Sequence, residues 1–177
     1  MKTLASLVLC GLAVTLGMSA CDDDDGPTEP DLEQFVATLL GSNEAAPNNT
    51  STATGTTILT INSDNTVSWT MDLNGIKNMT ASHIHAPAGP GVNASVAANL
   101  FIPTSTVTTT LSGRVASGTF GPANVNTAVV SYVDLLTAIR TGNAYVNIHT
   151  SDGIAPANTG MGDFPGGEIR GQTLPMP

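Results

Sequence analysis

The sequence predicts an all-β fold, an antiparallel β-sandwich or Greek-key barrel with one short helix near residues 131–141. Apolar residues alternate with Thr, Ser and other polar residues over short segments, which is typical of strands that bury one face. Glycine and proline account for 18 and 11 of the 177 residues and separate these segments. Eight or so short strands with such turns favour a sandwich or a barrel.

Residues 1–20 have the composition of a lipoprotein signal peptide. Lys2 precedes an apolar stretch over residues 4–16, which is too short to span a bilayer, and small residues lead up to Cys21. This arrangement resembles the lipobox of bacterial lipoproteins, in which cleavage leaves the cysteine as a lipid-modified N-terminus. Cys10 would leave with the signal, so the mature chain would have no internal disulfide. The alternative is an ordinary secretory signal.

Residues 21–31 predict an acidic, proline-containing tether. Four consecutive carboxylates, residues 22–25, repel one another and stay solvated, and two prolines follow. An acidic run at this place resembles the surface-export signal of Bacteroidota lipoproteins, whereas an Asp directly after the cysteine resembles an inner-membrane retention signal in enteric bacteria. We expect an exported protein, lipid-anchored to the bacterial cell envelope, with the outer membrane or cell surface favoured.

The remaining residues, 32–175, are enough for one domain with its own core. The chain carries 14 acidic residues against five Lys and Arg, a net charge of −9. Such a charge argues against nucleic acid as a partner, because its binding depends on cationic contacts to phosphates. The expected partners are the membrane, through lipid on Cys21, and an extracytoplasmic protein or glycan.

The predicted elements follow one another along this domain. A first strand covers residues 35–40, and a hairpin joins residues 59–61 and 67–73 across the turn-like segment 62–65. Further strands are predicted at 80–85, 96–102, 107–111, 114–120, 143–149 and 168–173. The short helix has Ser131 at its cap with Asp134 three places on, and Gly142 just beyond its end.

All three histidines of the chain lie in two of these strands. Because successive side chains of a strand point to opposite faces, apolar residues that face a core leave their neighbours facing away from it. If Ile84, Val146, Ile148 and Ile169 face the core, one outward face gathers His83, His85, Tyr145, Asn147, His149, Glu168 and Arg170.

This polar face has the residue types of a transition-metal site. His83 and His85 would project side by side about 7 Å apart, and His149 from a neighbouring strand would complete a three-imidazole site for Cu or Zn. Glu44 or Glu168 would supply an oxygen ligand or orient an imidazole. The alternative is a structural network, with the histidines hydrogen-bonded between strands and Glu168 paired with Arg170.

Several motifs resemble the CHRD domain, a module named for chordin that also occurs singly in bacterial secreted proteins. They are GSNEAAP at 41–47, His83-Ile84-His85 with the glycines at 89 and 91, YVNIHT at 145–150 and PGGEIRGQ at 165–172. The resemblance runs from about residue 34 to residue 174. It differs in Glu44-Ala45-Ala46-Pro47, where the family has Glu-Val-Pro-Pro, and in a longer 158–164 segment. It implies an all-β fold and no defined molecular activity.

We therefore expect a noncatalytic binding module whose candidate metal site is His83, His85 and His149, with Tyr145, Asn147 and Arg170 as a polar network. The first alternative is a structural or adhesion module of the cell envelope that recognises a protein or glycan without metal. A lesser alternative is a mononuclear metal hydrolase with Glu44 or Glu168 as base. No motif supports a serine or cysteine nucleophile, and we do not expect an enzyme.

Overall fold

The computed structural model describes residues 32–45 and 49–176, so the predicted signal peptide and tether lie outside the described residues. The described chain forms one antiparallel sheet, one α-helix and two short 3-10 helices. The strands are β1 (Glu33–Leu40), β2 (Thr54–Ile61), β3 (Val67–Ile76), β4 (Met79–His85), β5 (Val96–Phe101), β6 (Leu111–Phe120), β7 (Tyr145–Thr150) and β8 (Ile169–Pro175). The helices are η1 (Gly41–Asn43), η2 (Pro122–Asn124) and α1 (Tyr132–Arg140).

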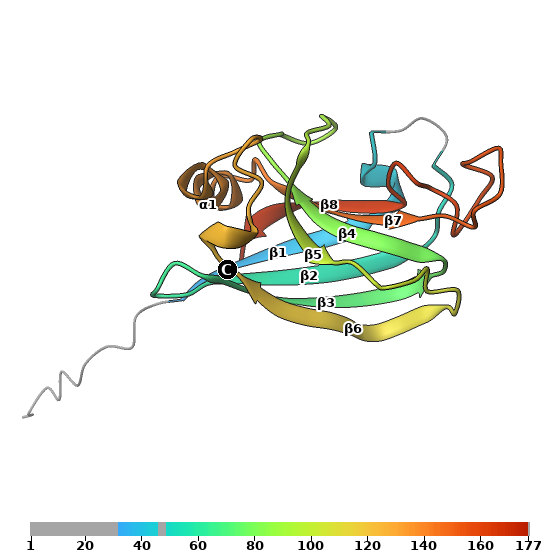
Figure 1. Cartoon of the computed structure of the whole chain (residues 1–177), viewed down its shortest axis with the longest axis horizontal. Helices are drawn as coiled ribbons and strands as arrows, with labels where there is room; N and C mark the ends of the chain where they lie inside the picture. The colour runs from blue at the N-terminus through green and yellow to red at the C-terminus, as the bar shows by residue number, and fades with distance from the viewer. Residues whose placement is uncertain (1–31, 46–48, 177) are drawn as a thin grey trace, which may run out of the picture.

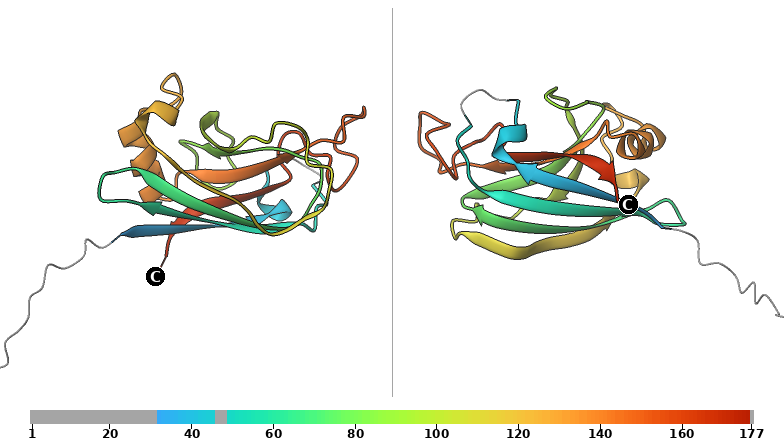
Figure 2. Two further views of the ribbon diagram at one scale, coloured as in Figure 1. Left: turned by 60° about the horizontal axis from the view of Figure 1, so that its bottom comes forward. Right: turned by 180° about the vertical axis from the view of Figure 1, so that it is seen from behind.

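The eight strands are hydrogen-bonded in the order β5-β4-β7-β8-β1-β2-β3-β6. The sheet curls around the core into a nearly closed barrel, with β5 and β6 as its two edges (Figures 1 and 2). The all-β fold with one short helix is thus confirmed, and the strands form a single sheet rather than two packed sheets.

Apolar and polar residues alternate along the strands, so that the apolar side chains point into the barrel and form its core. Along β3, Val67, Trp69, Met71 and Leu73 are buried, while the residues between them are only half-buried. The helix α1 covers one end of the barrel with Leu135, Leu136 and Ile139. Its predicted cap is confirmed, since the backbone N–H of Asp134 donates to the Ser131 hydroxyl at 3.1 Å.

The strand predicted at residues 107–111 is wrong. Val107 makes a single bridge with Met79, and β6 begins only at Leu111. Thr108 to Thr110 are exposed, so the segment has no apolar face to bury. It crosses the surface between β5 and β6 as a loop.

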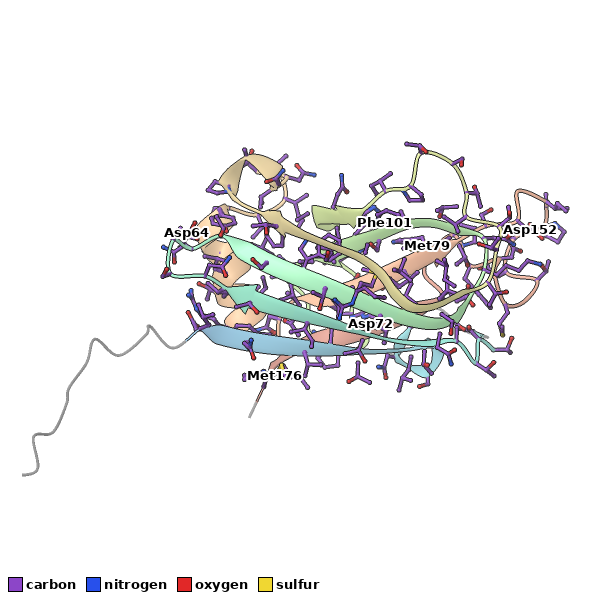
Figure 3. The ribbon with its side chains drawn as sticks, turned by 90° about the horizontal axis from the view of Figure 1, so that it is seen from below. Asp64, Asp72, Met79, Phe101, Asp152 and Met176 are labelled. Atoms are coloured by element: carbon purple, nitrogen blue, oxygen red, sulfur yellow. The ribbon has the colours of Figure 1, made fainter. Side chains whose placement is uncertain are left out.

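The two ends of the barrel carry different features. The start of β1 and the C-terminal end lie beside α1, and the β7–β8 loop (residues 151–168) lies at the opposite end (Figure 1). Asp64 in the β2–β3 turn and Asp152 in the β7–β8 loop mark these two ends in Figure 3. Arg140 joins α1 to β1 through two hydrogen bonds to Glu33, at 2.6 and 2.7 Å.

The described helices are all too short, or too polar, to span a bilayer.

Candidate metal centre

Three adjacent strands, β4, β7 and β8, bring the polar face together. His83 of β4 stands opposite Asn147 of β7, which stands opposite Arg170 of β8. In the same pair of strands, β4 and β7, His85 is opposite Tyr145 and His149 is opposite Ala81. Directly opposed side chains of an antiparallel pair lie within contact distance of one another. The sheet therefore places Asn147 between the histidines and Arg170.

The structure brings the three histidines into one cluster. One ring nitrogen from each of His83, His85 and His149 lies within 4.8 Å of the other two. Three atoms spaced in this way lie within about 2.8 Å of a common point, against roughly 2.0–2.1 Å for a Zn–N bond. A shift of less than about 1 Å per imidazole would therefore give bonding distances.

Two of these rings are held in the form that binds metal. Nδ1 of His85 lies 2.9 Å from the Ala94 carbonyl oxygen, and Nδ1 of His149 lies 2.8 Å from the Pro165 carbonyl oxygen. A carbonyl only accepts hydrogen bonds, so each Nδ1 carries the proton and each Nε2 keeps its lone pair. Both Nε2 atoms are buried and have no hydrogen-bond partner in the described structure. Metal-ligating histidines are typically oriented in this way.

The third ring, His83, also has a buried nitrogen, Nδ1, without a hydrogen-bond partner among the described residues. Burial lowers the pKa of His83 to about 4, and its proximity to His149 and His85 acts in the same direction. Burial likewise lowers the pKa of His85 and of His149. All three imidazoles are therefore neutral at neutral pH, as metal binding requires.

Loops cover this face of the sheet, so it is not an exposed polar surface. The β4–β5 loop (residues 86–95) contributes the Ala94 carbonyl, and the β7–β8 loop contributes the Pro165 carbonyl. Five of its residues are buried, with exposed fractions of 7% for His85, 3% for Asn147, 2% for Tyr145, 1% for Arg170 and 0% for Glu168, and His83 and His149 are half-buried. Removal from water strengthens every electrostatic interaction on this face.

Arg170 holds the β4–β5 loop against the sheet. Its Nη2 donates to the carbonyl oxygens of Gly89 at 3.2 Å and Val92 at 2.8 Å, and its Nη1 donates to Oδ1 of Asn93 at 3.2 Å. Its guanidinium carbon lies 3.4 Å from the centre of the Tyr145 ring. Arg170 thus fixes the loop that carries the carbonyl bonded to His85.

Glu168 holds the β7–β8 loop and does not join the histidines. Its Oε1 accepts from the Ser51 hydroxyl at 2.6 Å. Its Oε2 accepts from the Thr150 hydroxyl at 2.6 Å and from the Gly162 N–H at 3.0 Å. Both oxygens are thereby occupied, and Glu168 forms no ion pair with Arg170. The ion pair considered in the structural alternative is absent from the described residues.

Glu44 lies beside the cluster rather than in it. It follows η1, and its Oε1 accepts from Nδ2 of Asn147 at 2.7 Å. Burial raises the pKa of Glu44 to about 7, although the nearby charge of Arg170 acts in the opposite direction. Gly167 leaves room for this contact, because a Cβ on Gly167 would come within 2.6 Å of Glu44 Oε1.

Sequence reasoning missed the groups that orient the histidines and anchor the loops. The carbonyls of Ala94 and Pro165 carry no sequence signal, since every residue has one. Ser51 lies more than a hundred positions from its partner Glu168. Only Thr150 could have been found, because it follows His149 in the predicted motif at 145–150.

Comparison with known proteins supports one family. The family model described as CHRD domain matches residues 35–173, which is most of the chain. No curated protein and no solved structure matches the chain. The matched region contains β2 to β7 in full, most of β1 and β8, the three histidines, and both loop anchors, Glu168 and Arg170. The chain therefore belongs to the CHRD domain family.

Proposed function

We propose that this protein is a noncatalytic, lipid-anchored module of the bacterial cell envelope that binds a transition metal, Cu or Zn, through His83, His85 and His149. Two observations carry the proposal: one ring nitrogen from each histidine lies within 4.8 Å of the other two, and each ring has a buried nitrogen without a hydrogen-bond partner among the described residues. Buried polar atoms are normally paired, so an unpaired ring nitrogen on each of three clustered histidines calls for a ligand.

The donor set selects the metal class. Three neutral imidazoles suit Zn²⁺ and Cu²⁺, whereas Ca²⁺ and Mg²⁺ prefer oxygen ligands. The carboxylates of Glu44 and Glu168 are engaged with Asn147 and with the β7–β8 loop. Neither carboxylate belongs to the cluster of possible ligands. Because the donors are imidazole nitrogens, we expect Cu²⁺ to bind more tightly than Zn²⁺.

Titration calorimetry of the apo protein with Zn²⁺ and Cu²⁺ tests the proposal. We expect one metal per chain with a dissociation constant of about 1 μM or lower. The variant His83→Ala/His85→Ala removes two donors and should lose this binding. His85→Phe is a milder variant, since a phenyl ring can still stack on Tyr145 without supplying a nitrogen.

A control separates this site from the acidic run at residues 22–25. A variant with these four residues changed to Asn should keep the high-affinity binding, while both histidine variants keep the acidic run and lose it. Absence of binding at micromolar metal, or equal binding by the wild type and the double variant, would refute the site.

The lipid anchor is a separate part of the proposal and rests on the sequence before Cys21. Incorporation of a radioactive fatty acid by the wild type and by Cys21→Ser tests it. We expect label in the wild type alone, and equal label in both would show that this cysteine is not acylated. Fractionation of the envelope then identifies the membrane.

One observation favours the alternative of a recognition module without metal. The two loops over the polar face expose large apolar side chains, with Val92 on the β4–β5 loop and Ile154 on the β7–β8 loop 57% and 70% exposed. Binding residues often lie on loops held by a rigid scaffold. A protein or glycan partner that binds equally to metal-free and metal-loaded protein would favour this function.

The hydrolase alternative gains no support from the geometry of the described residues. A general base must lie within hydrogen-bond reach of the attacking water. Glu168 is committed to three hydrogen bonds, and Glu44 is hydrogen-bonded to Asn147 and is not part of the histidine cluster. The CHRD domain is not a known enzyme family, which is consistent with a noncatalytic role.

A further inference from the structure

A pocket of about 470 Å³ lies beside the histidine cluster, on the outer face of β1 and β8. Its floor comes from outward-facing residues of the two strands, its sides from η1 with Glu44 and from Pro90 and Gly91 of the β4–β5 loop. Strands β1 and β8 run side by side there (Figure 2). This volume is in the range of small-molecule sites, and none of the three histidines lines the pocket.

One end of the floor is apolar and the other is polar. Val36 of β1 and Leu174 of β8 are directly opposed and form the apolar end. Arg170 lies opposite Leu40, four residues along β1, and forms the polar end together with Glu44. A ligand that matches this floor has a short apolar body and a polar head at Arg170.

The charge at the polar end is positive. Arg170 is 1% exposed, and its hydrogen-bond acceptors are all neutral: two carbonyls, Asn93 and Gln172. Among the described residues no carboxylate lies within ion-pair distance of its guanidinium. A buried charge without a counter-charge is costly, so an anion bound beside it is stabilised.

The neighbouring carboxyl does not cancel this charge. Glu44 is largely desolvated, which raises its pKa to about 7, so near neutral pH a large share of it is uncharged. In that form its hydroxyl is a hydrogen-bond donor, which suits an anionic oxygen of a ligand. The pocket is a positive site in a chain whose net charge is −9.

We propose that this pocket binds small organic monocarboxylates, with the carboxylate at Arg170 and Glu44 and the short apolar chain over Val36 and Leu174. This site uses none of the three histidines of the metal centre. The guanidinium supplies the counter-charge, and the two apolar side chains supply an area that grows with the length of the ligand chain.

Titration of the metal-free full-length protein with acetate, butyrate and hexanoate tests the proposal, followed by calorimetry or ligand-observed NMR. We expect binding at about 1 mM for butyrate and a gain of roughly threefold for each added methylene. Butyramide has the same shape without the charge, and we expect it to bind at least about tenfold more weakly. Butylamine should not bind.

A blocking variant locates the site. Ser42→Trp places an indole at the exposed side of the pocket and leaves Arg170 and its contacts in place. We expect it to abolish butyrate binding while Ser105→Trp, on an exposed loop that does not line the pocket, leaves it unchanged. Thermal unfolding of both variants at the wild-type temperature establishes that they are folded.

Three results would overturn the proposal. They are no binding of any carboxylate at roughly 10 mM, equal binding of butyrate and butyramide, and unchanged binding by a folded Ser42→Trp variant. None of these results bears on the metal titration, which uses different ligands and different variants.

Discussion

The ring of Tyr145 lies parallel to the ring of His85, with an interplanar angle of 2° and centroids 4.8 Å apart. The Tyr145 hydroxyl also accepts from the Ala94 N–H at 3.2 Å, and the Ala94 carbonyl is bonded to Nδ1 of His85. Tyr145 therefore restrains His85 twice, through its ring and through the loop. This restraint has a measurable consequence for metal affinity.

We expect Tyr145→Ala to weaken Cu²⁺ or Zn²⁺ binding by about 10- to 100-fold, the usual effect of removing a group that orients a ligand. Tyr145→Phe keeps the stacked ring and should lose less than about tenfold. Competition titration with a chromophoric chelator measures both. Tyr132→Phe, in α1, is a matched control and should leave the affinity unchanged. An unchanged metal affinity in Tyr145→Ala would show that Tyr145 is not needed to orient the His85 ring.

The low histidine pKa values predict metal binding that persists at acidic pH. Protons compete with metal only when the histidines would otherwise be charged, and the pKa of His83 is lowered to about 4. Burial also lowers the pKa of His85 and of His149, so we expect the affinity for Zn²⁺ to stay unchanged as the pH falls through 6.5 and to decrease only at lower pH. Affinity that falls steadily from pH 6.5, the value of an ordinary histidine, would contradict this environment.

The same shift predicts how the stability of the metal-free protein depends on pH. Between pH 6.5 and about 4 the unfolded chain binds a proton at His83 that the folded chain does not. Stability from this group is complete above pH 6.5 and is lost as the pH falls. Urea unfolding should show that His83→Gln is less sensitive to this pH range than the wild type.

The raised pKa of Glu44 predicts a pH dependence of stability with the opposite sign. Its folded-state pKa of about 7 exceeds the ordinary 4.5, so its contribution is present below pH 4.5 and is lost as the pH rises through 7. Glu44→Gln keeps an oxygen for Asn147, and we expect it to be more stable than the wild type at pH 8 and equal at pH 4.5. Glu33→Gln is the control with reversed sign, because Arg140 lowers the pKa of Glu33.

Removal of Arg170 should destabilise the fold strongly. Arg170→Met removes the buried guanidinium that donates to the carbonyls of Gly89 and Val92 and to the Asn93 side chain, which we expect to cost about 3–5 kcal/mol. Arg114→Met removes an exposed arginine paired with Asp72 and should cost less than about 1 kcal/mol. Equal losses in urea unfolding of the two variants would mean that the β4–β5 loop does not depend on Arg170.

Gly171 is predicted to tolerate no side chain. A Cβ there would lie 2.7 Å from the carbonyl carbon of Thr38 on the neighbouring strand β1. We expect Gly171→Ala to destabilise the domain by about 2–4 kcal/mol, measured by chemical unfolding. Gly166→Ala, in the same motif, meets nothing within 4 Å and should change stability by less than about 0.5 kcal/mol.

The features that could be predicted from the sequence are those that depend on the local alternation of apolar and polar residues. The faces of β3, β7 and β8 follow directly from period two, so Trp69 points into the core and His149 away from it. The cap at Ser131 is equally local, since donor and acceptor are three residues apart. These features need no knowledge of the rest of the chain.

The covering of the polar face could not be predicted, because it depends on contacts between distant segments. Glu168 and Arg170 are two residues apart, and the structural alternative paired them, yet each binds a different loop. The carboxylate of Glu168 reaches Ser51, and the guanidinium of Arg170 reaches residues 89–93. Strand spacing gives the direction of a side chain, but only the path of the loops determines its partner.

The hydrogen bonds that set the protonation of His85 and His149 come from the main chain, at Ala94 and Pro165. Any amino acid at these two positions provides a carbonyl, so the loop side chains are free to diverge while the imidazoles keep their chemistry. Substitutions in the β4–β5 and β7–β8 loops can then change which partners the loop surface contacts without changing the protonation of the histidines beneath it. The loop surface and the histidine cluster can thereby evolve separately within one small domain.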